Sequence, residues 1–483
     1  MKRRFISFVV AAALIAASFT GCGGSEVQYV EGNSESSTTD EASLNASTET
    51  DGALPRHISE SYDLENKKLV FDCDVEGTDS YGKLSAISLE KVNFTPEDME
   101  DSATRFFDDG KYEVIQPLEF MTKDDCKEWK KKIEARLSEL GITAEEAKKD
   151  DKYRYLAFEM ADCDNLLDTS GVDEVYDDEG NPLQAESEDM PPFEDKGICW
   201  YENPNVEGIN EYAYCALYGK TDGEDASITF RRDAGVDEMI YTKCKALGFA
   251  PYYSFFELEA AGVATEEGDT ATNSDGMKAD DVIAVAESFA SERGFSDFKT
   301  QRVFDVPSGW LSGEDTTVES EYDGYYVCMT RDYDGYTTPY NSYYQYGGNL
   351  WDRNNGKAIS LCYESVTVYV DNGEALILDY KGPVKVTDKK DVVNVMDFKE
   401  LQKQAVELLK EKGNGSDLHI TDMKIGYART NDPSDIGKMT LVPAVYYIKD
   451  NEQNPYYKND PILIINAIDG TDISINSDVL NSI

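Results

Sequence analysis

The stretch from residue 336 to residue 351 concentrates the side chains best suited to holding a ligand. Aromatic rings stack on sugar rings and on peptide prolines, and a tyrosine hydroxyl adds a hydrogen bond. Set among glycine, asparagine and proline, these rings are a candidate loop for binding a glycan or a peptide. The preferred interpretation is that the rings pack the loop against a sheet, because tyrosine is common in β-structure. The candidate surface comprises Tyr336, Tyr340, Tyr343, Tyr344, Tyr346 and Trp351.

Sequence patterns of the familiar enzyme classes give no support for catalysis. The chain has two histidines, His57 and His419, which excludes a multi-histidine metal site. His-Glu-x-x-His, Gly-x-Ser-x-Gly and Gly-x-Gly-x-x-Gly do not occur. Paired carboxylates for glycoside hydrolysis are defined by their separation in space, so they cannot be chosen from 95 acidic residues. We expect no catalytic or cofactor-binding residue, and a hydrolase with an unrecognised site is the weakest alternative.

The acidic residues lack the spacing of a dedicated calcium-binding loop. An EF-hand needs an oxygen ligand at its first position and glycine at its sixth. With Gly180 or Gly335 at the sixth position, the first position falls on Val175 or Thr330, and both candidates fail on that count. The sequence therefore predicts no dedicated metal site. Adventitious Ca²⁺ binding by the acidic loop at residues 173 to 195 stays open, since hard cations favour clustered carboxylates.

The overall charge limits the kinds of partner. The formal net charge is −49, from 95 acidic and 46 basic residues. Nucleic acid requires a basic footprint, and anionic lipid headgroups require a basic patch, so neither is an expected partner. The one basic cluster, residues 127 to 136, interleaves lysines with glutamates and predicts a solvated helix.

The N-terminus has the pattern of an export signal. Three basic residues precede an apolar run of about 15 residues, which is shorter than the roughly 20 needed to span a bilayer. The run ends in Phe19-Thr20-Gly21-Cys22, which resembles the lipobox of bacterial lipoproteins. This resemblance implies cleavage after Gly21 and a diacylglyceryl thioether on Cys22. A plain secretory signal with a chance cysteine is the alternative.

Composition changes divide the rest of the chain. Residues 22–53 are rich in serine, threonine and acids, which predicts a disordered tether. A polar segment at 265 to 277 separates an N-terminal α+β region, 54–264, from the C-terminal half. Within that half we expect two modules, 277–395 and 396–483. With residues 1–21 as signal peptide, these ranges complete the expected domain organisation.

Hydrophobic patterning predicts an α+β fold. In the N-terminal region, strands are expected at 68–75, 84–92, 197–201, 211–219 and 226–232, with helices after Thr95, Thr122 and Thr143. In the C-terminal half, amphipathic helices are expected at 278–295 and 397–413. The first precedes strands at 298–306, 323–331, 365–371 and 374–380, and the second precedes strands at 418–429, 438–448 and 461–470. The sequence therefore predicts a helix packed on an antiparallel meander, repeated twice.

Eight cysteines remain if Cys22 carries lipid. Their connectivity cannot be read from the sequence. Two pairs are possible: Cys199 and Cys215 flank an expected hairpin, and Cys328 and Cys362 lie on expected neighbouring strands. Buried, reduced cysteines acting as small apolar residues are an equal alternative.

Three segments near the C-terminus carry a family resemblance. "MKIGYARTN" (423–431), "LVPAVYY" (441–447) and "ILIINAIDG" (462–470) resemble the closing repeat of PepSY-like and Yyc-type extracytoplasmic regulators, although a tryptophan is common where Val445 stands. "YYVCMTRDYDGYTTPY" (325–340) resembles an earlier hairpin of such modules. With "LPRHISESYDL" (54–64), the whole chain resembles large uncharacterised lipoproteins of Gram-positive anaerobes. The resemblance implies a non-catalytic regulatory module.

These observations lead to one preferred expectation. The chain is expected to be a lipid-anchored protein at the outer face of the cytoplasmic membrane, where it binds or regulates a partner in the cell envelope. The alternative is a lipoprotein that binds a glycan or a peptide through Tyr336 to Trp351.

Overall fold

The computed structural model describes residues 54–64, 67–115, 123–149, 153–168, 175–176, 182–183, 197–202, 213–233, 236–243, 265–266, 277–312, 317–338, 349–352, 357–360, 363–412, 417–432, 435–449 and 461–474. These described residues belong to one compact unit. The predicted signal peptide, Cys22 and the tether at 22–53 lie outside the described residues.

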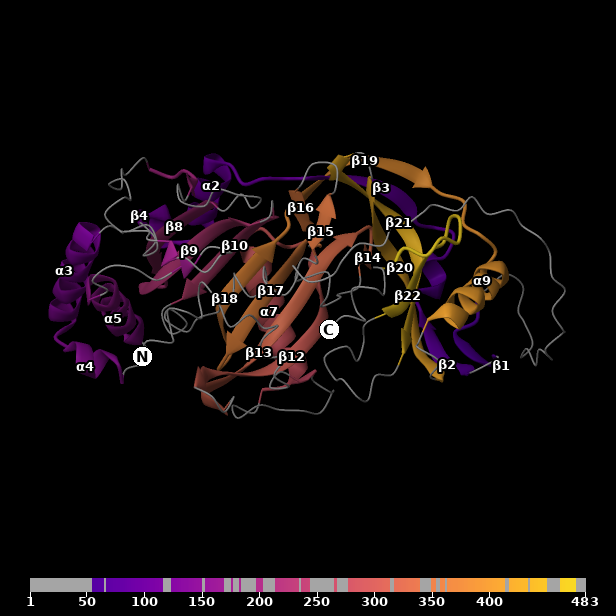
Figure 1. The fold of residues 1–483 in the computed structure, drawn as a ribbon, viewed down its shortest axis with the longest axis horizontal. Coiled ribbons are helices and arrows are strands. Elements are labelled where there is room, and N and C mark those ends of the chain that lie inside the picture. Colours follow the sequence, from indigo (N-terminus) through magenta and orange to yellow (C-terminus); the bar gives the residue numbers. More distant parts are fainter. Residues whose placement is uncertain are drawn as a thin grey trace. The chain divides into compact units, whose positions relative to one another are not determined.

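Antiparallel β-structure dominates, and the expected α+β class is confirmed at that level (Figure 1). One sheet has seven strands in the order β1-β2-β20-β21-β3-β19, with β22 paired to β21. Its strands are β1 (His57–Asp63), β2 (Lys68–Glu76), β3 (Ser85–Lys91), β19 (Val384–Val392), β20 (Leu418–Asp432), β21 (Asp435–Lys449) and β22 (Pro461–Asn466).

A second sheet has eleven strands in the order β11-β12-β13-β17-β18-β10-β9-β8-β4, with β14 paired to β13 and β7 to β8. Its strands are β4 (Tyr112–Ile115), β7 (Tyr201–Glu202), β8 (Ala213–Thr221), β9 (Glu224–Asp233), β10 (Val236–Lys243), β11 (Thr265–Glu266), β12 (Phe298–Ser312), β13 (Thr317–Tyr333), β14 (Tyr336–Thr337), β17 (Ser365–Asp371) and β18 (Glu374–Lys381). Two short hairpins join β5 (Val175–Tyr176) to β6 (Pro182–Leu183) and β15 (Asn349–Asp352) to β16 (Lys357–Ser360).

Each sheet takes strands from both sides of the segment 265–277. β3 pairs with β19 and β21, and β10 pairs with β18, all antiparallel. β2 pairs with β20 in parallel, with Leu69 opposite Leu418. Strand pairing therefore does not divide the chain at this segment, and the N-terminal hairpin β1–β2 completes a sheet built mainly from the C-terminal end.

The described helices are α2 (Pro96–Phe106), α3 (Lys123–Leu140), α4 (Ala144–Ala147), α5 (Arg154–Asp168), α7 (Ala279–Glu292) and α9 (Phe398–Glu411). Thr95 and Thr143 each form a capping box with the acidic residue three positions later. The single helix expected after Thr143 is wrong, because α4 ends at Ala147 and α5 begins at Arg154. No described helix has the length and apolar character needed to cross a membrane.

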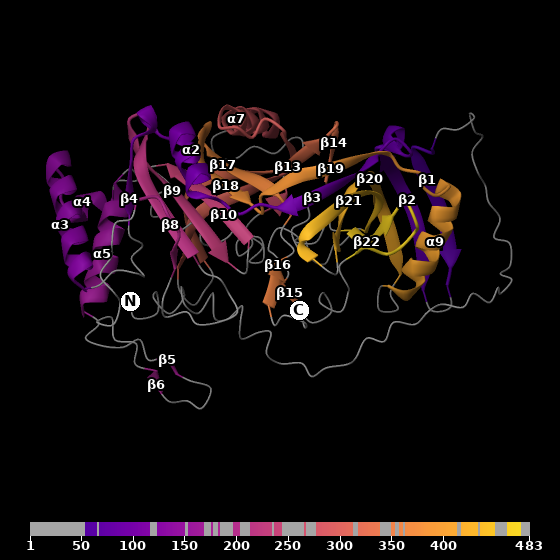
Figure 2. The same ribbon diagram turned by 90° about the horizontal axis from the view of Figure 1, so that it is seen from above.

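Two helices cover the principal cores. α7 lies along one face of the eleven-stranded sheet (Figure 2), and its Val282, Ala286 and Ala290 are buried against that face. α9 buries Leu401, Ala405 and Leu409 against the seven-stranded sheet. Burial of these apolar stripes is the main favourable contribution to folding.

A buried ion pair lies where β13 leaves the eleven-stranded sheet. The guanidinium of Arg331 donates to both carboxylate oxygens of Glu364, at 2.6 and 2.7 Å. Tyr380 donates to the same carboxylate at 2.8 Å, and Arg331 also bonds Asp297. The Glu364 side chain is 4% exposed. The charge of Glu364 is therefore stabilised by several donors, and the pKa of Arg331 is raised despite its burial, chiefly by the hydrogen bond to Glu364.

We expect Glu364→Ala to lower the free energy of unfolding by about 3 to 5 kcal/mol, because it leaves the Arg331 cation buried without its main partner. Urea denaturation monitored by circular dichroism measures the loss. Glu90→Ala is the control, since Glu90 pairs with Lys385 at a more exposed position, where ion pairs contribute about 0 to 1 kcal/mol. Equal losses in both variants would contradict the assignment.

Candidate functional site

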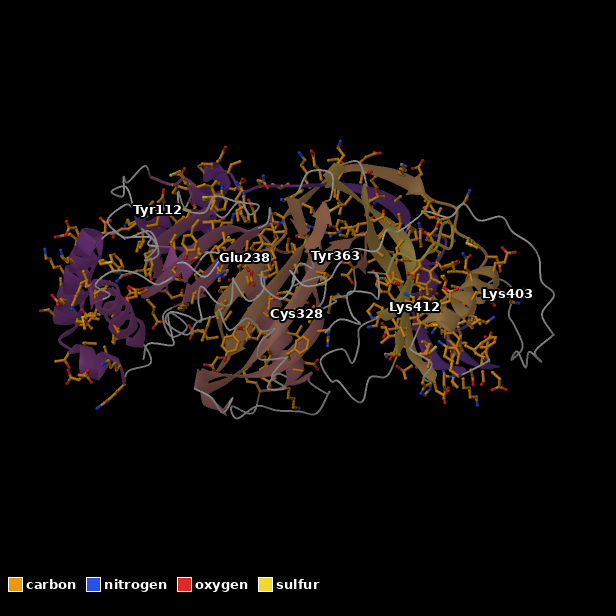
Figure 3. All side chains as sticks on the ribbon, viewed as in Figure 1. Tyr112, Glu238, Cys328, Tyr363, Lys403 and Lys412 are labelled. Carbon is orange, nitrogen blue, oxygen red and sulfur yellow. The ribbon has the colours of Figure 1, made fainter. Side chains whose placement is uncertain are left out.

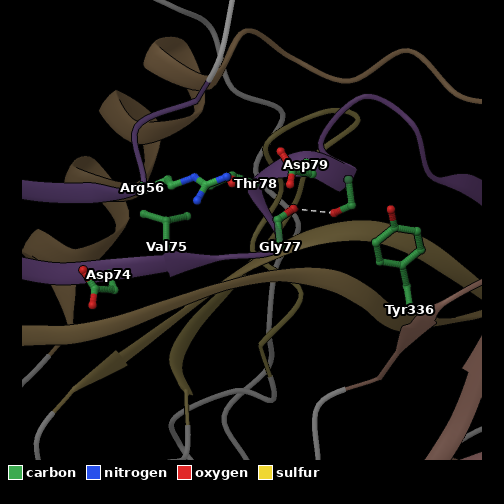
Figure 4. Close-up of a pocket in the computed structure, with 8 residues that line it drawn as sticks. Arg56, Asp74, Val75, Gly77, Thr78, Asp79 and Tyr336 are labelled. Carbon is green, nitrogen blue, oxygen red and sulfur yellow. Dashed lines mark hydrogen bonds between the residues drawn. The ribbon is translucent and has the colours of Figure 1, made fainter. Parts of the chain in front are cut away.

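A pocket of about 480 Å³ lies beside the turn that follows β2 (Figure 4). This volume falls within the roughly 300 to 1,000 Å³ typical of small-molecule sites. Its lining comes from the N-terminal hairpin, from the turn after β2 and from β14. The lining residues are Arg56, Asp74, Val75, Gly77, Thr78, Asp79, Ser80 and Tyr336.

The turn is held in place by its own backbone. Gly77 has φ +75°, a left-handed conformation that favours glycine, and an added Cβ would lie 2.5 Å from the carbonyl oxygen of Ile425. Ser80 Oγ donates to the Gly77 carbonyl at 2.6 Å, and residues Thr78–Ser80 form one turn of 3-10 helix. Close packing of Gly77 on β20 therefore fixes the floor of the pocket.

The turn also has a spacing that resembles a phosphate-binding loop, Gly77-x4-Gly82-Lys83. A true loop of this kind places serine or threonine after the lysine and leads into an α-helix. Here the next residue is the buried Leu84, and the turn leads into β3. Asp79 also adds a negative charge within the turn. The context therefore excludes phosphate cradling, although the spacing is the sequence signal that marks this pocket.

Charges of both signs line the pocket. Arg56 and Asp79 are exposed, and neither forms an ion pair with another described residue. Asp74 accepts a hydrogen bond from His57 Nδ1 at 2.9 Å, and this bond is the main reason that the pKa of His57 is raised. A ligand with a carboxylate and an amine would find an opposite charge for each group.

Tyr336 is the residue of the predicted aromatic surface whose side chain the structure places. It is half-buried on β14 and packs beside Tyr333, Tyr427 and Leu441. In Figure 4 its ring and Arg56 lie on opposite sides of the Gly77 turn. Tyr336 therefore contributes both to a core and to the pocket.

The other members of the predicted surface are not placed beside it. Trp351 lies on β15 opposite Ala358, and its side chain is not among those described. Tyr340, Tyr343, Tyr344 and Tyr346 lie outside the described residues, so their exposure stays a prediction. Sequence reasoning missed Arg56 and Asp79, because their approach to Tyr336 depends on pairing between distant strands.

A second polar cluster lies on the face of the eleven-stranded sheet opposite α7. Glu238 on β10 stands between Arg231 on β9 and Lys381 on β18 (Figure 3 labels Glu238). Lys381 Nζ is 2.8 Å from Glu238 Oε1 and 3.1 Å from Asp379 Oδ2. Tyr326, from β13, completes the polar groups near Asp379.

The two carboxyl groups of this cluster differ in their affinity for protons. Burial raises the pKa of Asp379 to about 7, and the negative charge of Glu238 adds to the rise against the opposing effect of Lys381. Burial also disfavours the Glu238 carboxylate, yet Lys381, Arg231 and a hydrogen bond with Asp379 hold its pKa below the ordinary value. Asp379 is therefore the group that keeps a proton near neutral pH.

The structure bears on the expected metal binding and on the two suggested disulfide bridges. Within the described ranges, no three histidine, cysteine or acidic side chains are grouped to hold a metal ion. Most of the acidic loop at 173–195 lies outside those ranges, so adventitious Ca²⁺ binding there stays untested. The suggested bridge between Cys199 and Cys215 is wrong, since both are reduced. Cys328 is also reduced, and Cys362 is outside the described residues.

Comparison with known proteins gives two distant structural neighbours. No family model and no curated protein sequence matches the chain. An uncharacterised protein from Eubacterium rectale ATCC 33656 is similar over 88% of this chain and 94% of its own, with 12% identity and a TM-score of 0.41. The C-terminal domain of YpeB from Bacillus megaterium is similar over 58% of this chain and 87% of its own, with 9% identity and a TM-score of 0.24. At these values neither likeness assigns a family.

We expect Asp379→Asn to flatten the pH dependence of stability between about pH 4 and pH 7. The folded chain holds the Asp379 proton up to about pH 7, whereas the unfolded carboxyl loses it near its ordinary pKa of 3.8. Folding stability therefore falls as pH rises through this window, by at most about 4 kcal/mol. The actual loss is smaller because the side chain is 24% exposed. Urea denaturation at a series of pH values measures it.

The exposed Asp388→Asn is the control for this measurement. It removes a carboxyl from the same chain without touching the cluster. Asp379→Asn should match the wild type near pH 4 and exceed it above pH 7. Wild-type and Asp379→Asn profiles that run parallel across the window would show that Asp379 does not carry the proton.

Proposed function

We propose that this chain is a non-catalytic, lipid-anchored binding protein of the bacterial cell envelope, and that the pocket beside Gly77 holds its ligand. The observation that carries the binding proposal is the meeting of Arg56, Asp79 and Tyr336 around one pocket. The anchor is inferred from the export signal and Cys22. The PepSY-like resemblance of the segments at 423–431, 441–447 and 462–470 supports a regulatory role toward an envelope partner.

The preferred ligand class is a short peptide that carries both a carboxylate and an amine. Arg56 offers a planar cation that matches a carboxylate, and Asp79 offers an acceptor for an amine. The half-buried ring of Tyr336 adds an apolar surface for a side chain of the peptide. Such a peptide could be free or could be the end of a larger envelope partner.

A neutral glycan is the alternative ligand. Carboxylates accept hydrogen bonds from sugar hydroxyls, and Tyr336 offers a ring for stacking. Arg56 has no anionic group to bind on a neutral sugar, which is why the peptide is preferred. The rest of the predicted surface, through Trp351, would extend the site in either case.

We expect Tyr336→Ala and Arg56→Ala each to weaken peptide binding about tenfold or more, since each removes one side of the pocket. Peptide and glycan arrays identify the best ligand, and calorimetry measures its dissociation constant. Lys403→Ala is the control, because Lys403 is on the exposed face of α9. Failure of every peptide and glycan to bind, or equal affinity in all three variants, would overturn the assignment of the pocket.

We expect Cys22→Ser to release the protein from the membrane fraction of its host. The substitution removes the thioether that would hold the lipid, and with it the proposed attachment to the membrane. Membrane fractionation and the mass of the N-terminal peptide are the measurements. Cys199→Ser should leave the protein in the membrane fraction. Unchanged partition of the Cys22 variant, or an unmodified wild-type cysteine, would contradict anchoring while leaving the binding proposal untouched.

A further inference from the structure

Helices α3 and α5 pack along one apolar seam. Ile133 and Leu137 from α3 are buried together with Leu156 and Ala157 from α5. Polar contacts fix the register of the two helices: Lys130 bonds Asp164, and Trp129 Nε1 donates to Glu159 at 3.2 Å. Cys126, which precedes Ile133 on α3, contacts Cys163, which follows Leu156 on α5, so the packing is antiparallel.

Two cysteines form the next layer of the same seam. Cys126 precedes Ile133 by seven residues, and Cys163 follows Leu156 by seven residues. Seven residues are about two helical turns, so each cysteine projects from the face that its seam partner occupies. Cys126 is 1% exposed and Cys163 is 0% exposed, and the two form a cluster with Trp129. Their side chains are in hydrogen-bond contact.

Cys126 differs from two other buried cysteines, Cys73 and Cys215. Cys73 lies in the core beneath α9, where burial raises its pKa to about 12. Burial likewise raises the pKa of Cys215 to about 12. The pKa of Cys126 is lowered instead, because the thiol of Cys163 hydrogen-bonds its sulfur. Cys126 thus has a greater thiolate fraction than Cys73 or Cys215, and the thiolate is the nucleophile in thiol–disulfide exchange.

We propose that Cys126 and Cys163 are a reversible redox site that closes into a disulfide between α3 and α5. The Cys126 thiolate attacks a sulfur of an external disulfide and releases one thiolate from it. The Cys163 thiolate then attacks the Cys126 sulfur of this mixed disulfide and releases the second thiol. Two protein thiols are oxidised, and the external disulfide accepts both electrons to become two thiols.

Access to the pair requires local opening of the seam. Both sulfurs are buried, so an external disulfide reaches Cys126 only when α5 separates transiently from α3. Exchange is therefore slow, and the disulfide is protected once the helices close again.

Oxidation would fasten the helical unit that rests against β8 and β9. Tyr218 on β8 donates to Glu159 at 2.6 Å, and Arg136 on α3 pairs with Asp225 on β9. These contacts hold each helix to the sheet separately. A covalent link between the helices restricts their open state, so we expect the equilibrium constant for opening to fall. Amide exchange in α3 and α5 should then slow by roughly a hundredfold.

The test equilibrates the full chain with mixtures of oxidised and reduced glutathione. Remaining thiols are then alkylated in denaturant and mapped by mass spectrometry. The expected product is a peptide crosslink between residues 126 and 163, with Cys73 alkylated throughout, and reduction with dithiothreitol restores both thiols. Amide exchange of the oxidised form should show the added protection in α3 and α5.

Two variants keep the outcome decisive. Cys126→Ala and Cys163→Ala should each abolish the crosslink and remove the redox dependence of amide exchange, while Cys73→Ala should leave both. If either seam variant fails to fold, the wild-type crosslink map still decides. Full alkylation of Cys126 and Cys163 under oxidising conditions, or a crosslink from either to another cysteine, would overturn the proposal.

Discussion

The paired charges of Arg331 and Glu364 hold together the part of the structure on which the rest depends. Glu364 precedes β17, Arg331 is near the end of β13, Tyr380 belongs to β18, and Asp297 precedes β12. One buried carboxylate thus joins neighbouring strands and the segment that follows α7. Because an unpaired charge is costly when buried, the strand ends can meet in few arrangements other than this one. The guanidinium also lies 4.9 Å from the ring centre of Phe298, which encloses the pair further.

The pocket depends on the same ion pair because only a short turn of the chain separates Arg331 on β13 from Tyr336 on β14. Tyr333 follows Arg331 on β13 and enters a core with Tyr427 and Met439 of the seven-stranded sheet. The turn between β13 and β14 is closed by Asp332, whose carboxylate accepts a hydrogen bond from the Gly335 amide. Lys389 on β19 pairs with Asp334 in the same turn. The ring that lines the pocket is therefore positioned by charges that do not touch the pocket.

Local features were largely predictable from the sequence, and distant pairings were not. The strands expected at 365–371 and 374–380 are confirmed within one residue. The alternation of apolar and polar residues and the flanking turn residues that predict a strand are features of the local sequence. The cap at Thr95 is confirmed for the same reason. Sequence could not show that Gly77 packs on Ile425, because that contact follows from the register of β2 on β20. Nor could it show that Arg56 and Tyr336 line one pocket, because that depends on the packing of β14 beside β20. The meeting of Cys126 with Cys163 did have a local signal, the seven-residue offset from Ile133 and Leu156, once the helices are known to be antiparallel.

The parallel pairing of β2 with β20 has a consequence for how the chain reaches its fold. Leu69 is among the first residues of the folded part to be synthesised, and its partner Leu418 is among the last. At about 5 to 20 residues per second, the ribosome delivers the second strand some tens of seconds after the first. During that delay one edge of β2 has no neighbour, and its alternating Leu69, Phe71 and Cys73 have no core. The seven-stranded sheet therefore closes only after β20 has been synthesised, and until then the unpaired edge of β2 is open to pairing with other chains.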